Sequence, residues 1–285
     1  MNSFLSLLNL SGIGEDTFQA PVSPERSGRV YGGQFLAQGL SAAIRTTDTD
    51  RDVHSLHASF LRGGDVDTPT SFRVERVRDG RSFGSRSVSA LQQGKELFRM
   101  MVSFHVPEPG DEYAGDQMPD VPPPASVSLT YTEFSRMNGE AEDWDGESRP
   151  MDIRYINPPG APAGEPVTEP QRMWLRIPEK LGDEWADHFA GLAYLSDSTL
   201  IDHVVLPHGR RWQEPDLNGV SLDHGMWFHS RVRADEWLLF DQRVIATMNA
   251  RGLAQGRFFN QSGQLVASCV QEGMIRWSDY AERTV

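Results

Sequence analysis

The chain has 285 residues, and its composition, with 38% hydrophobic and 24% charged residues, is that of a soluble globular protein. These proportions exclude a disordered chain, a collagen-like repeat and a small disulfide-stapled domain. The formal net charge of −13 predicts no nucleic-acid partner, and an anionic ligand would need a local basic patch.

The first third of the chain predicts one helix followed by an antiparallel meander. Residues 32–44 are rich in Gly, Ala and Ser, which predicts a helix whose small side chains let it lie close against a sheet. Four β-rich segments separated by turn residues come next: 54–61, 71–78, 85–91 and 96–105.

The middle of the chain is rich in Pro and in acidic residues. It contains the tract Pro122-Pro123-Pro124 and an acidic run at 140–145, and its apolar periodicity is weak. This composition predicts a linker, with one short helix at 127–137.

The second half repeats the pattern of the first. We expect extended segments, a helix and four strands, in the order 151–156, 173–177, 184–205, 220–229, 237–247, 252–259 and 265–276. Ser55-Leu56 recurs as Ser221-Leu222 at an offset of 166 residues, and an offset of 168 residues aligns Ser103 with Gln271. The sequence therefore predicts a duplicated unit of α+β class, with domains at 1–108 and 151–285 and a linker at 109–150.

Asp197 is the most informative residue of the predicted helix 184–205. It lies at helical spacing with four apolar residues, which together form one stripe: Phe189, Ala193, Leu200 and Val204. A carboxylate on a core-facing stripe needs polar partners or a cavity, because burying it alone costs several kcal/mol. The alternative is a rotated stripe, with Asp197 solvated or capping the helix.

Other patterns carry less chemistry. Gly80-Arg81-Ser82-Phe83-Gly84 matches a hydrolase nucleophile elbow, but a β-like segment follows it where the elbow needs a helix, so we interpret Ser82 as a hairpin residue. His54 and His57 lie three apart on a predicted strand, which places them on opposite faces and predicts no zinc site there. His54 is either a pocket residue or a structural histidine.

Two further features leave alternatives open. The six arginines between residues 62 and 86 outnumber the four acids, so this region is either a phosphate-attracting patch or a solvated sheet face. The single cysteine, Cys269, alternates with Gln271 and is either a small buried thiol or a reactive one. Because one cysteine cannot form an intramolecular disulfide, the sequence favours a reducing, cytoplasmic location.

With these residues in view, the chain resembles the acyl-CoA thioesterase II family, whose members carry two hotdog domains in tandem. The resemblance covers nearly the full length and rests on blocks from both halves, in the family's order: 30–34, 54–62, 78–83, 192–197, 206–209, 221–229 and 270–273. It implies a double hotdog fold, in which each half wraps an antiparallel sheet round one long helix.

The resemblance also implies a catalytic trio of Asp197, Ser221 and Gln271 around an attacking water. Ser221 stands where the family pattern has Thr, which keeps the hydroxyl but loses the methyl group that stiffens the side chain. The resemblance further places His54 at a histidine once considered catalytic, so His54 is a secondary candidate.

We therefore expect an acyl-CoA hydrolase that releases fatty acid and CoA, uses no metal or bound cofactor, and forms a homo-oligomer without a membrane partner. One alternative is a hotdog hydratase or dehydratase, but no second acid paired with a His accompanies the expected site. The other is a noncatalytic acyl-CoA-binding module, in which Asp197 merely caps a polar pocket.

Overall fold

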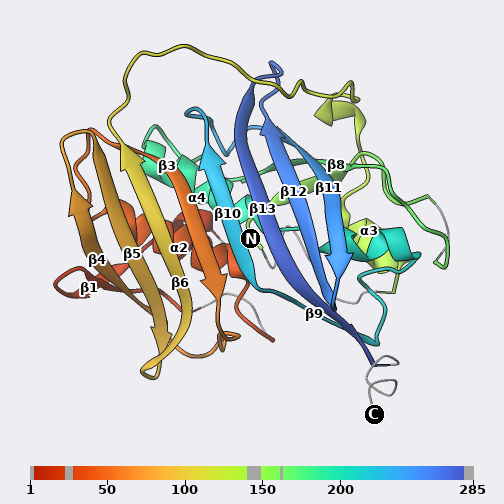
Figure 1. Ribbon diagram of the computed structural model, residues 1–285, viewed down its shortest axis with the longest axis horizontal. Helices are drawn as coiled ribbons and strands as arrows, with labels where there is room; N and C mark the ends of the chain where they lie inside the picture. The colour runs from red at the N-terminus through yellow and green to blue at the C-terminus, as the bar shows by residue number, and fades with distance from the viewer. Residues whose placement is uncertain (1–2, 23–27, 140–148, 161–162, 279–285) are drawn as a thin grey trace.

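An antiparallel sheet dominates the structure, a computed structural model that describes residues 3–22, 28–139, 149–160 and 163–278 (Figure 1). The acidic run at 140–145 lies outside the described residues. Within the described residues the strands are β1 (Ser11–Gly14), β2 (Thr17–Gln19), β3 (Asp52–Phe60), β4 (Ser71–Asp79), β5 (Phe83–Gln92), β6 (Lys95–His105), β7 (Asp152–Tyr155), β8 (Gln171–Arg176), β9 (Leu217–Ser221), β10 (Asp223–Phe228), β11 (Leu238–Met248), β12 (Arg251–Phe259) and β13 (Leu265–Trp277).

The strand order reveals two matching halves joined in the middle of the sheet. The order is β1-β2-β4-β5-β6-β3-β10-β13-β12-β11-β8-β7, and β9 pairs with the end of β13. The run β4-β5-β6-β3 is thus the mirror of β10-β13-β12-β11, as a two-fold rotation between β3 and β10 requires. The expected duplication of a helix-and-meander unit is present in this topology.

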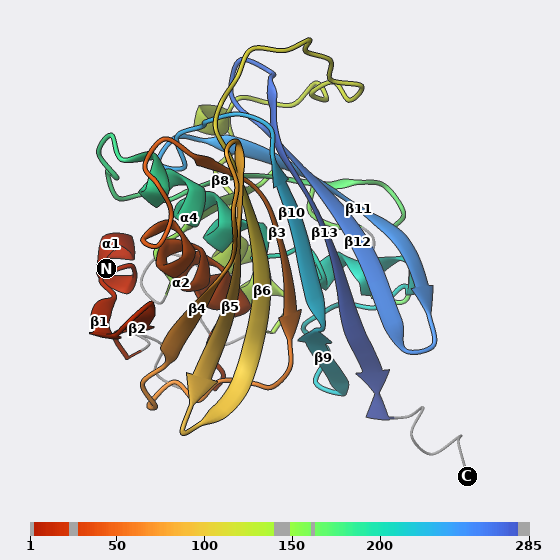
Figure 2. The same cartoon turned by 60° about the vertical axis from the view of Figure 1, so that its left-hand side comes forward.

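Two helices pack side by side on one face of the sheet (Figure 2). Helix α2 (Gly32–Ile44) has the bounds expected from its small residues, and α4 (Trp185–Ser196) is its counterpart in the second half. The main hydrophobic core lies between these helices and the sheet. We call the face of the sheet that α2 and α4 cover the inner face. No helix in the described part of the chain is long and apolar enough to cross a membrane.

Two helix predictions need correction. The helix expected at 184–205 ends at Ser196, and a separate 3-10 helix, η2 (Asp202–His208), follows after a turn. The short helix expected at 127–137 begins later, as α3 (Tyr131–Met137), because Thr130 and Glu133 form a capping box that fixes its start. Two small elements complete the set: α1 (Phe4–Leu7) and the 3-10 turn η1 (Pro124–Ser126).

The Pro-rich middle segment packs against the outer face of the sheet. Trp174, Leu239 and Phe259 form a second hydrophobic cluster there, and partly buried side chains of the segment, Met118, Val121 and Val127, cover it. The Trp174 indole also donates a hydrogen bond to the Pro122 carbonyl, at 2.9 Å. The part of the linker that the structure describes is therefore ordered by apolar contact, a role that its composition did not indicate.

Candidate active site

Asp197 caps the C-terminus of α4 rather than lying within a helix. Its φ and ψ are −92° and 0°, and the chain leaves the helix directly after it. The expected stripe through residue 204 was therefore wrong in its geometry. The burial that it predicted is confirmed, because Asp197 is only 7% exposed and Leu200 and Val204 are fully buried.

Gln271 lies against this buried carboxylate from the inner face of β13. Its Nε2 donates to Asp197 Oδ1 at 2.5 Å and to Ser221 Oγ at 2.8 Å. Ser221 is the last residue of β9, which pairs with β13 through the register Ser221–Gly273. The structure thus brings together all three residues of the expected trio, from three separate elements.

The first half of the chain contributes the N-terminus of α2. The Gly33 backbone N–H donates to the Asp197 carboxylate, and the partial positive charge of a helix N-terminus favours an anion there. Glycines allow this approach: a Cβ on Gly32 would lie 2.5 Å from Asp197 Oδ2, and one on Gly33 would lie 2.4 Å from the Tyr194 carbonyl oxygen. The site is therefore built from both halves.

Burial and hydrogen bonding act in opposite directions on Asp197. Desolvation raises the pKa of its carboxyl to about 7, while hydrogen bonds from Gln271 and Gly33 and the charge of Arg149 lower it. The balance leaves a carboxyl that exchanges its proton near neutral pH. Such a pKa suits a group that takes a proton in one step and returns it in another.

A cavity of about 350 Å³ opens beside the trio. Its wall includes Ser221 and Gly32, and a Cβ on Gly32 would lie 2.5 Å from Asp197 Oδ2. Two aromatic residues, Phe35 and Phe60, and two arginines, Arg29 and Arg62, also line it. A ligand in this cavity can reach Ser221 directly.

Sequence reasoning missed His224 of β10, which is 1% exposed and lies behind the trio. Its Nε2 lies 2.9 Å from Ser196 Oγ, and burial lowers its pKa to about 4. The alternation of His224, Met226 and Phe228 along the strand was a signal of its inward direction. The contribution of Gly33 left no such signal, because a backbone N–H has no residue-specific pattern.

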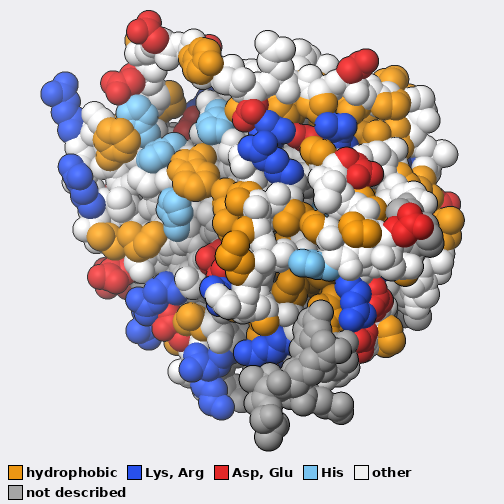
Figure 3. Space-filling view, turned by 45° about the vertical axis from the view of Figure 1, so that its right-hand side comes forward, with side chains coloured by type: hydrophobic (Ala, Val, Ile, Leu, Met, Phe, Trp, Pro, Cys, Tyr) orange, Lys and Arg blue, Asp and Glu red, His pale blue; other side chains and the backbone are white. Residues whose placement is uncertain are grey.

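His54 lies far from this chemistry, on the outer face of the sheet. Its Nε2 is 2.7 Å from Ser103 Oγ, and its ring contacts Phe83 and His105. Figure 3 shows histidine and hydrophobic side chains gathered on the surface of the molecule. The structure does not bring His54 to Asp197, so the secondary candidate does not join the trio.

The prediction that His54 and His57 face opposite sides was wrong. A β-bulge between Val53 and Ser55 inserts one residue into β3 opposite β6. The bulge turns His54 outward, to the side on which His57 contacts Trp227.

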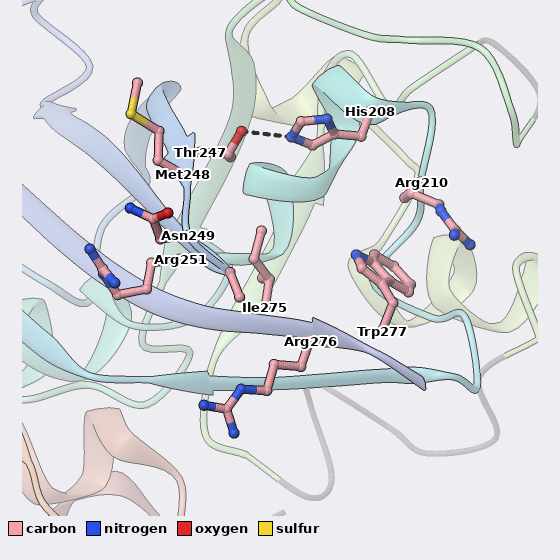
Figure 4. A pocket seen from close by; sticks show the side chains of 10 residues that line it. His208, Arg210, Thr247, Met248, Asn249, Arg251, Ile275, Arg276 and Trp277 are labelled. Carbon is pink, nitrogen blue, oxygen red and sulfur yellow. Dashed lines mark hydrogen bonds between the residues drawn. The ribbon is translucent and has the colours of Figure 1, made fainter. Parts of the chain in front are cut away.

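A larger cavity, of about 570 Å³, lies at the far end of β13 (Figure 4). Side chains from η2, from the β11–β12 hairpin and from β13 surround it, including His208, Thr247, Ile275 and Trp277. His208 and Thr247 are hydrogen-bonded to each other at 2.6 Å. No member of the trio lines this cavity, so its size does not make it the candidate site.

The remaining motifs have structural roles. Ser82 lies in the hairpin between β4 and β5, and Cys269 is fully buried. Arg86 is 1% exposed and donates to Thr46 and Asp79, so the arginine-rich region is in part a paired structural network. Across the described ranges, no three His, Cys, Asp or Glu side chains gather closely enough to hold a metal ion.

Comparisons with known proteins show the family of this chain. Residues 146–274 match the family model of acyl-CoA thioesterase, and residues 21–105 match that of the acyl-CoA thioesterase N-terminal domain. Acyl-coenzyme A thioesterase 8 of Homo sapiens is 34% identical, over 95% of this chain and 88% of its own length. Acyl-CoA thioesterase 2 of Haemophilus influenzae is 32% identical, over 98% of this chain and 99% of its own.

Solved structures show the same fold. The acyl-CoA thioesterase II TesB2 of Mycobacterium marinum superposes with a TM-score of 0.80 at 35% identity, covering 98% of this chain and 100% of that one. A hotdog-fold protein of Alicyclobacillus acidocaldarius superposes at 0.76 with 20% identity, covering 97% and 98%. The expected double hotdog fold of α+β class is confirmed.

Proposed function

Since the chain belongs to the acyl-CoA thioesterase family and hydrolyses acyl-CoA thioesters, we propose that Asp197, Ser221 and Gln271 carry out this reaction. The observation that supports the proposal is the pair of hydrogen bonds by which Gln271 Nε2 joins the Asp197 carboxylate to the Ser221 hydroxyl. A buried carboxylate with a pKa near 7 is thereby held beside a hydroxyl that faces a cavity.

Asp197 acts as the general base. In its ionised form it takes a proton from a water molecule held against Ser221, and the water oxygen forms a bond to the thioester carbonyl carbon. A thioester carbonyl is less stabilised by resonance than an ester, so water with such a base suffices and no covalent enzyme intermediate is needed. The C–S bond then breaks, and the proton on Asp197 passes to the departing sulfur, which gives a fatty acid and the CoA thiol.

Gln271 positions the other two groups. Its two amide protons point to Asp197 and Ser221, so both are engaged before the substrate arrives. This assigns Gln271 to orientation of the base and the hydroxyl rather than to the carbonyl oxygen of the substrate. Prior orientation lowers the entropy that must be lost in the transition state.

The cavity beside Ser221 receives the acyl-CoA. Phe35 and Phe60 offer apolar contact to the acyl portion. Arg29 and Arg62 are exposed at the same cavity and supply the local positive charge that the CoA phosphates need on a chain with a net charge of −13.

Thiol release from acyl-CoAs of increasing chain length tests the proposal, with wild type and Asp197→Asn compared after circular dichroism confirms that both are folded. We expect the variant to lose roughly 100-fold or more in kcat. Full activity of a folded variant would overturn the role of Asp197. Because only hydrolysis frees the thiol, the same assay separates this reaction from a hydratase and from a binding module.

We propose domains at 1–108 and 151–285 joined by a linker at 109–150, a cytoplasmic location and a homo-oligomer. The buried, reduced Cys269 supports the location, and its pKa is raised by burial. The mass of the protein in solution tests the assembly, and a monomer would contradict it.

A further inference from the structure

A buried histidine, His224, lies next to the side chain of Gln271 on the neighbouring strand. His224 and Gln271 lie on the paired strands β10 and β13, one position beyond the register pair Gly225–Val270, and both side chains are buried on the inner face. In the part of the chain that the structure describes, Gln271 Oε1 and His224 Nδ1 are both buried and make no hydrogen bond of normal geometry, yet a side-chain interaction with Gln271 acts to raise the pKa of His224 against the effect of burial. Two unsatisfied polar atoms on neighbouring positions are costly unless they satisfy each other.

The chemistry of Asp197 decides which atom of the amide faces which neighbour. An ionised carboxylate can only accept hydrogen bonds, so the end of the Gln271 amide that meets Asp197 must be the NH₂ group. The end that meets His224 is then the carbonyl oxygen, which also can only accept. His224 must therefore carry a proton on Nδ1.

The other ring nitrogen completes the chain of hydrogen bonds. His224 is neutral near neutral pH, because burial lowers its pKa to about 4, so a proton on Nδ1 leaves a lone pair on Nε2. Ser196 Oγ, at 2.9 Å, has a hydroxyl proton that can be donated to this lone pair instead of to the Ala193 carbonyl at 2.8 Å.

We propose that His224 is a positioning residue, whose Nδ1–H holds the Gln271 carbonyl oxygen and so keeps the Gln271 NH₂ group turned toward Asp197 and Ser221. The donors then run in one direction: Ser196 to His224, His224 to Gln271, and Gln271 to Asp197. The inference rests on the proposed role of the trio and adds the device that fixes its orientation. Without His224, the amide is free to rotate by 180° and present its oxygen to the carboxylate.

Loss of this orientation changes the proton affinity of Asp197. An amide oxygen facing the carboxylate disfavours its ionised form, so the pKa of Asp197 rises above its wild-type value. Among the described residues, the charged or titratable groups that act on Asp197 or on its partner Gln271 include Arg149, Cys269 of β13 and His224 of β10, while α2 supplies the Gly33 N–H and β9 the Ser221 hydroxyl. Of these, His224 acts on Asp197 through the Gln271 amide.

The first experiment reads the proton directly in the unaltered protein. Nitrogen-15 NMR of the imidazole rings at pH 7.5, with the His224 signals assigned by their loss in His224→Asn, reports which nitrogen is protonated. We expect Nδ1 to be protonated and Nε2 to be bare. A proton on Nε2 with a bare Nδ1 overturns the proposal, whatever the activity of the variants.

The second experiment uses two amides of different length. The amide of Asn is attached at Cγ, as Nδ1 is, so His224→Asn retains a donor toward Gln271, whereas the longer His224→Gln reaches toward Ser196. We expect His224→Gln to lose roughly 10- to 100-fold in kcat with little change in KM, and its acid limb to move to higher pH, while His224→Asn recovers most of the loss. His203→Gln makes the same change at another buried, neutral histidine and should leave the pH profile unmoved.

The outcomes separate this inference from the proposed function. If Gln271→Ala is as active as wild type, the trio fails and the inference fails with it. If Gln271→Ala is impaired, but His224→Gln is as active as His224→Asn and both have the wild-type pH profile, only the positioning role of His224 is overturned.

Discussion

The two halves of the molecule share one scaffold but differ in the polarity of a few inner positions. In the first half, β3 and β6 place Leu56 opposite Val102 on the inner face, and both are fully buried. At the matching place in the second half, β10 and β13 carry His224 and Gln271. The duplicated sheet thus provides two equivalent frames, and the chemistry is concentrated in one of them.

The N-termini of α2 and α4 also differ in polarity: only the N-terminus of α2 is suited to binding a carboxylate. Helix α2 begins with Gly32-Gly33 and has no acidic residue in its first turn, so it accepts the Asp197 carboxylate closely. Helix α4 follows Glu184 and carries Asp187 in its first turn, and these acids disfavour a second anion there.

Each half also retains a cavity at the corresponding place. Phe35 of α2 and the segment after β3 line the cavity at the trio, and Phe189 of α4 and the segment after β10 line a cavity of about 550 Å³ on the other side. Where the first cavity has Ser221, the second has the start of β3, with Val53 and His54. Both halves of the duplicated fold therefore have a cavity, but only one of them has the polar groups proposed for hydrolysis, Asp197, Ser221 and Gln271.

The largest effect on kcat is expected when Gln271 in the second half is replaced by valine, the residue at the matching position of the first half. Gln271→Val copies the inner position occupied by Val102, and we expect kcat to fall roughly 100- to 1,000-fold because Asp197 and Ser221 lose their common donor. Steady-state thiol release measures the loss. Ser103→Ala, on the outer face, is the matched control and should be nearly silent, and a silent Gln271→Val would contradict the role given to that amide.

A methyl group at the start of α2 should break the contact between the halves. In Gly32→Ala the new Cβ would lie 2.5 Å from Asp197 Oδ2, so the carboxylate or the helix must shift. We expect about a tenfold or greater loss of kcat/KM in a folded protein. Gly110→Ala, at a glycine with open space around it, is the control, and equal activity of both variants would show that the close approach is not needed.

Removing the buried charge should stabilise the protein while it removes activity. The folded-state pKa of Asp197, about 7, lies above its ordinary value of 3.8, so the native state holds the proton more tightly than the unfolded chain. Stability is therefore lost as pH rises from about 4 through 7, and Asp197→Asn should be more stable than wild type at pH 8, by up to about 4 kcal/mol.

Urea unfolding at two pH values measures this difference. At pH 8 the midpoint of Asp197→Asn should lie above that of wild type, and near pH 4 the two should converge. A variant less stable than wild type at pH 8 would mean that the hydrogen bonds to the carboxylate outweigh its desolvation.

The smallest effect is expected at the secondary candidate. His54→Gln changes a ring on the outer face that contacts Ser103, Phe83 and His105, so kcat/KM should stay within about twofold of wild type. A loss above tenfold would mean that His54 takes part in catalysis and that the cavity beside Ser221 is not the one in which the reaction occurs.

The sequence predicted most of the strands and α2, because alternation and turn residues are local signals. It did not predict β1 or β2, and the one strand expected at 220–229 is divided into β9 and β10. It failed where a tertiary contact decides the structure. No helix-breaking residue marks the end of α4 at Ser196, so the sequence did not predict it. The bulge at His54 turns this side chain to the face opposite to the one that simple alternation predicts.

The site was predicted by resemblance and only in part by physical pattern. Asp197 stood out as an acid among apolar residues, but nothing in the spacing placed Ser221 or Gln271 beside it. The repeat alignment matched Gln271 with Ser103, whereas the structure matches it with Val102, because Ser103 points outward beside His54. A register difference of one residue reverses the face, and few identities cannot fix it.

The central claim is that a buried Asp197 with a pKa near 7 is the base, and the pH dependence of kcat/KM tests it most directly. Thiol release from one saturable acyl-CoA between pH 5 and 9 should rise with a single ionisation near pH 7 and then level off, as a base that acts when deprotonated requires. A rate that is flat from pH 5 to 8, or that falls as pH rises through 7, would contradict the account.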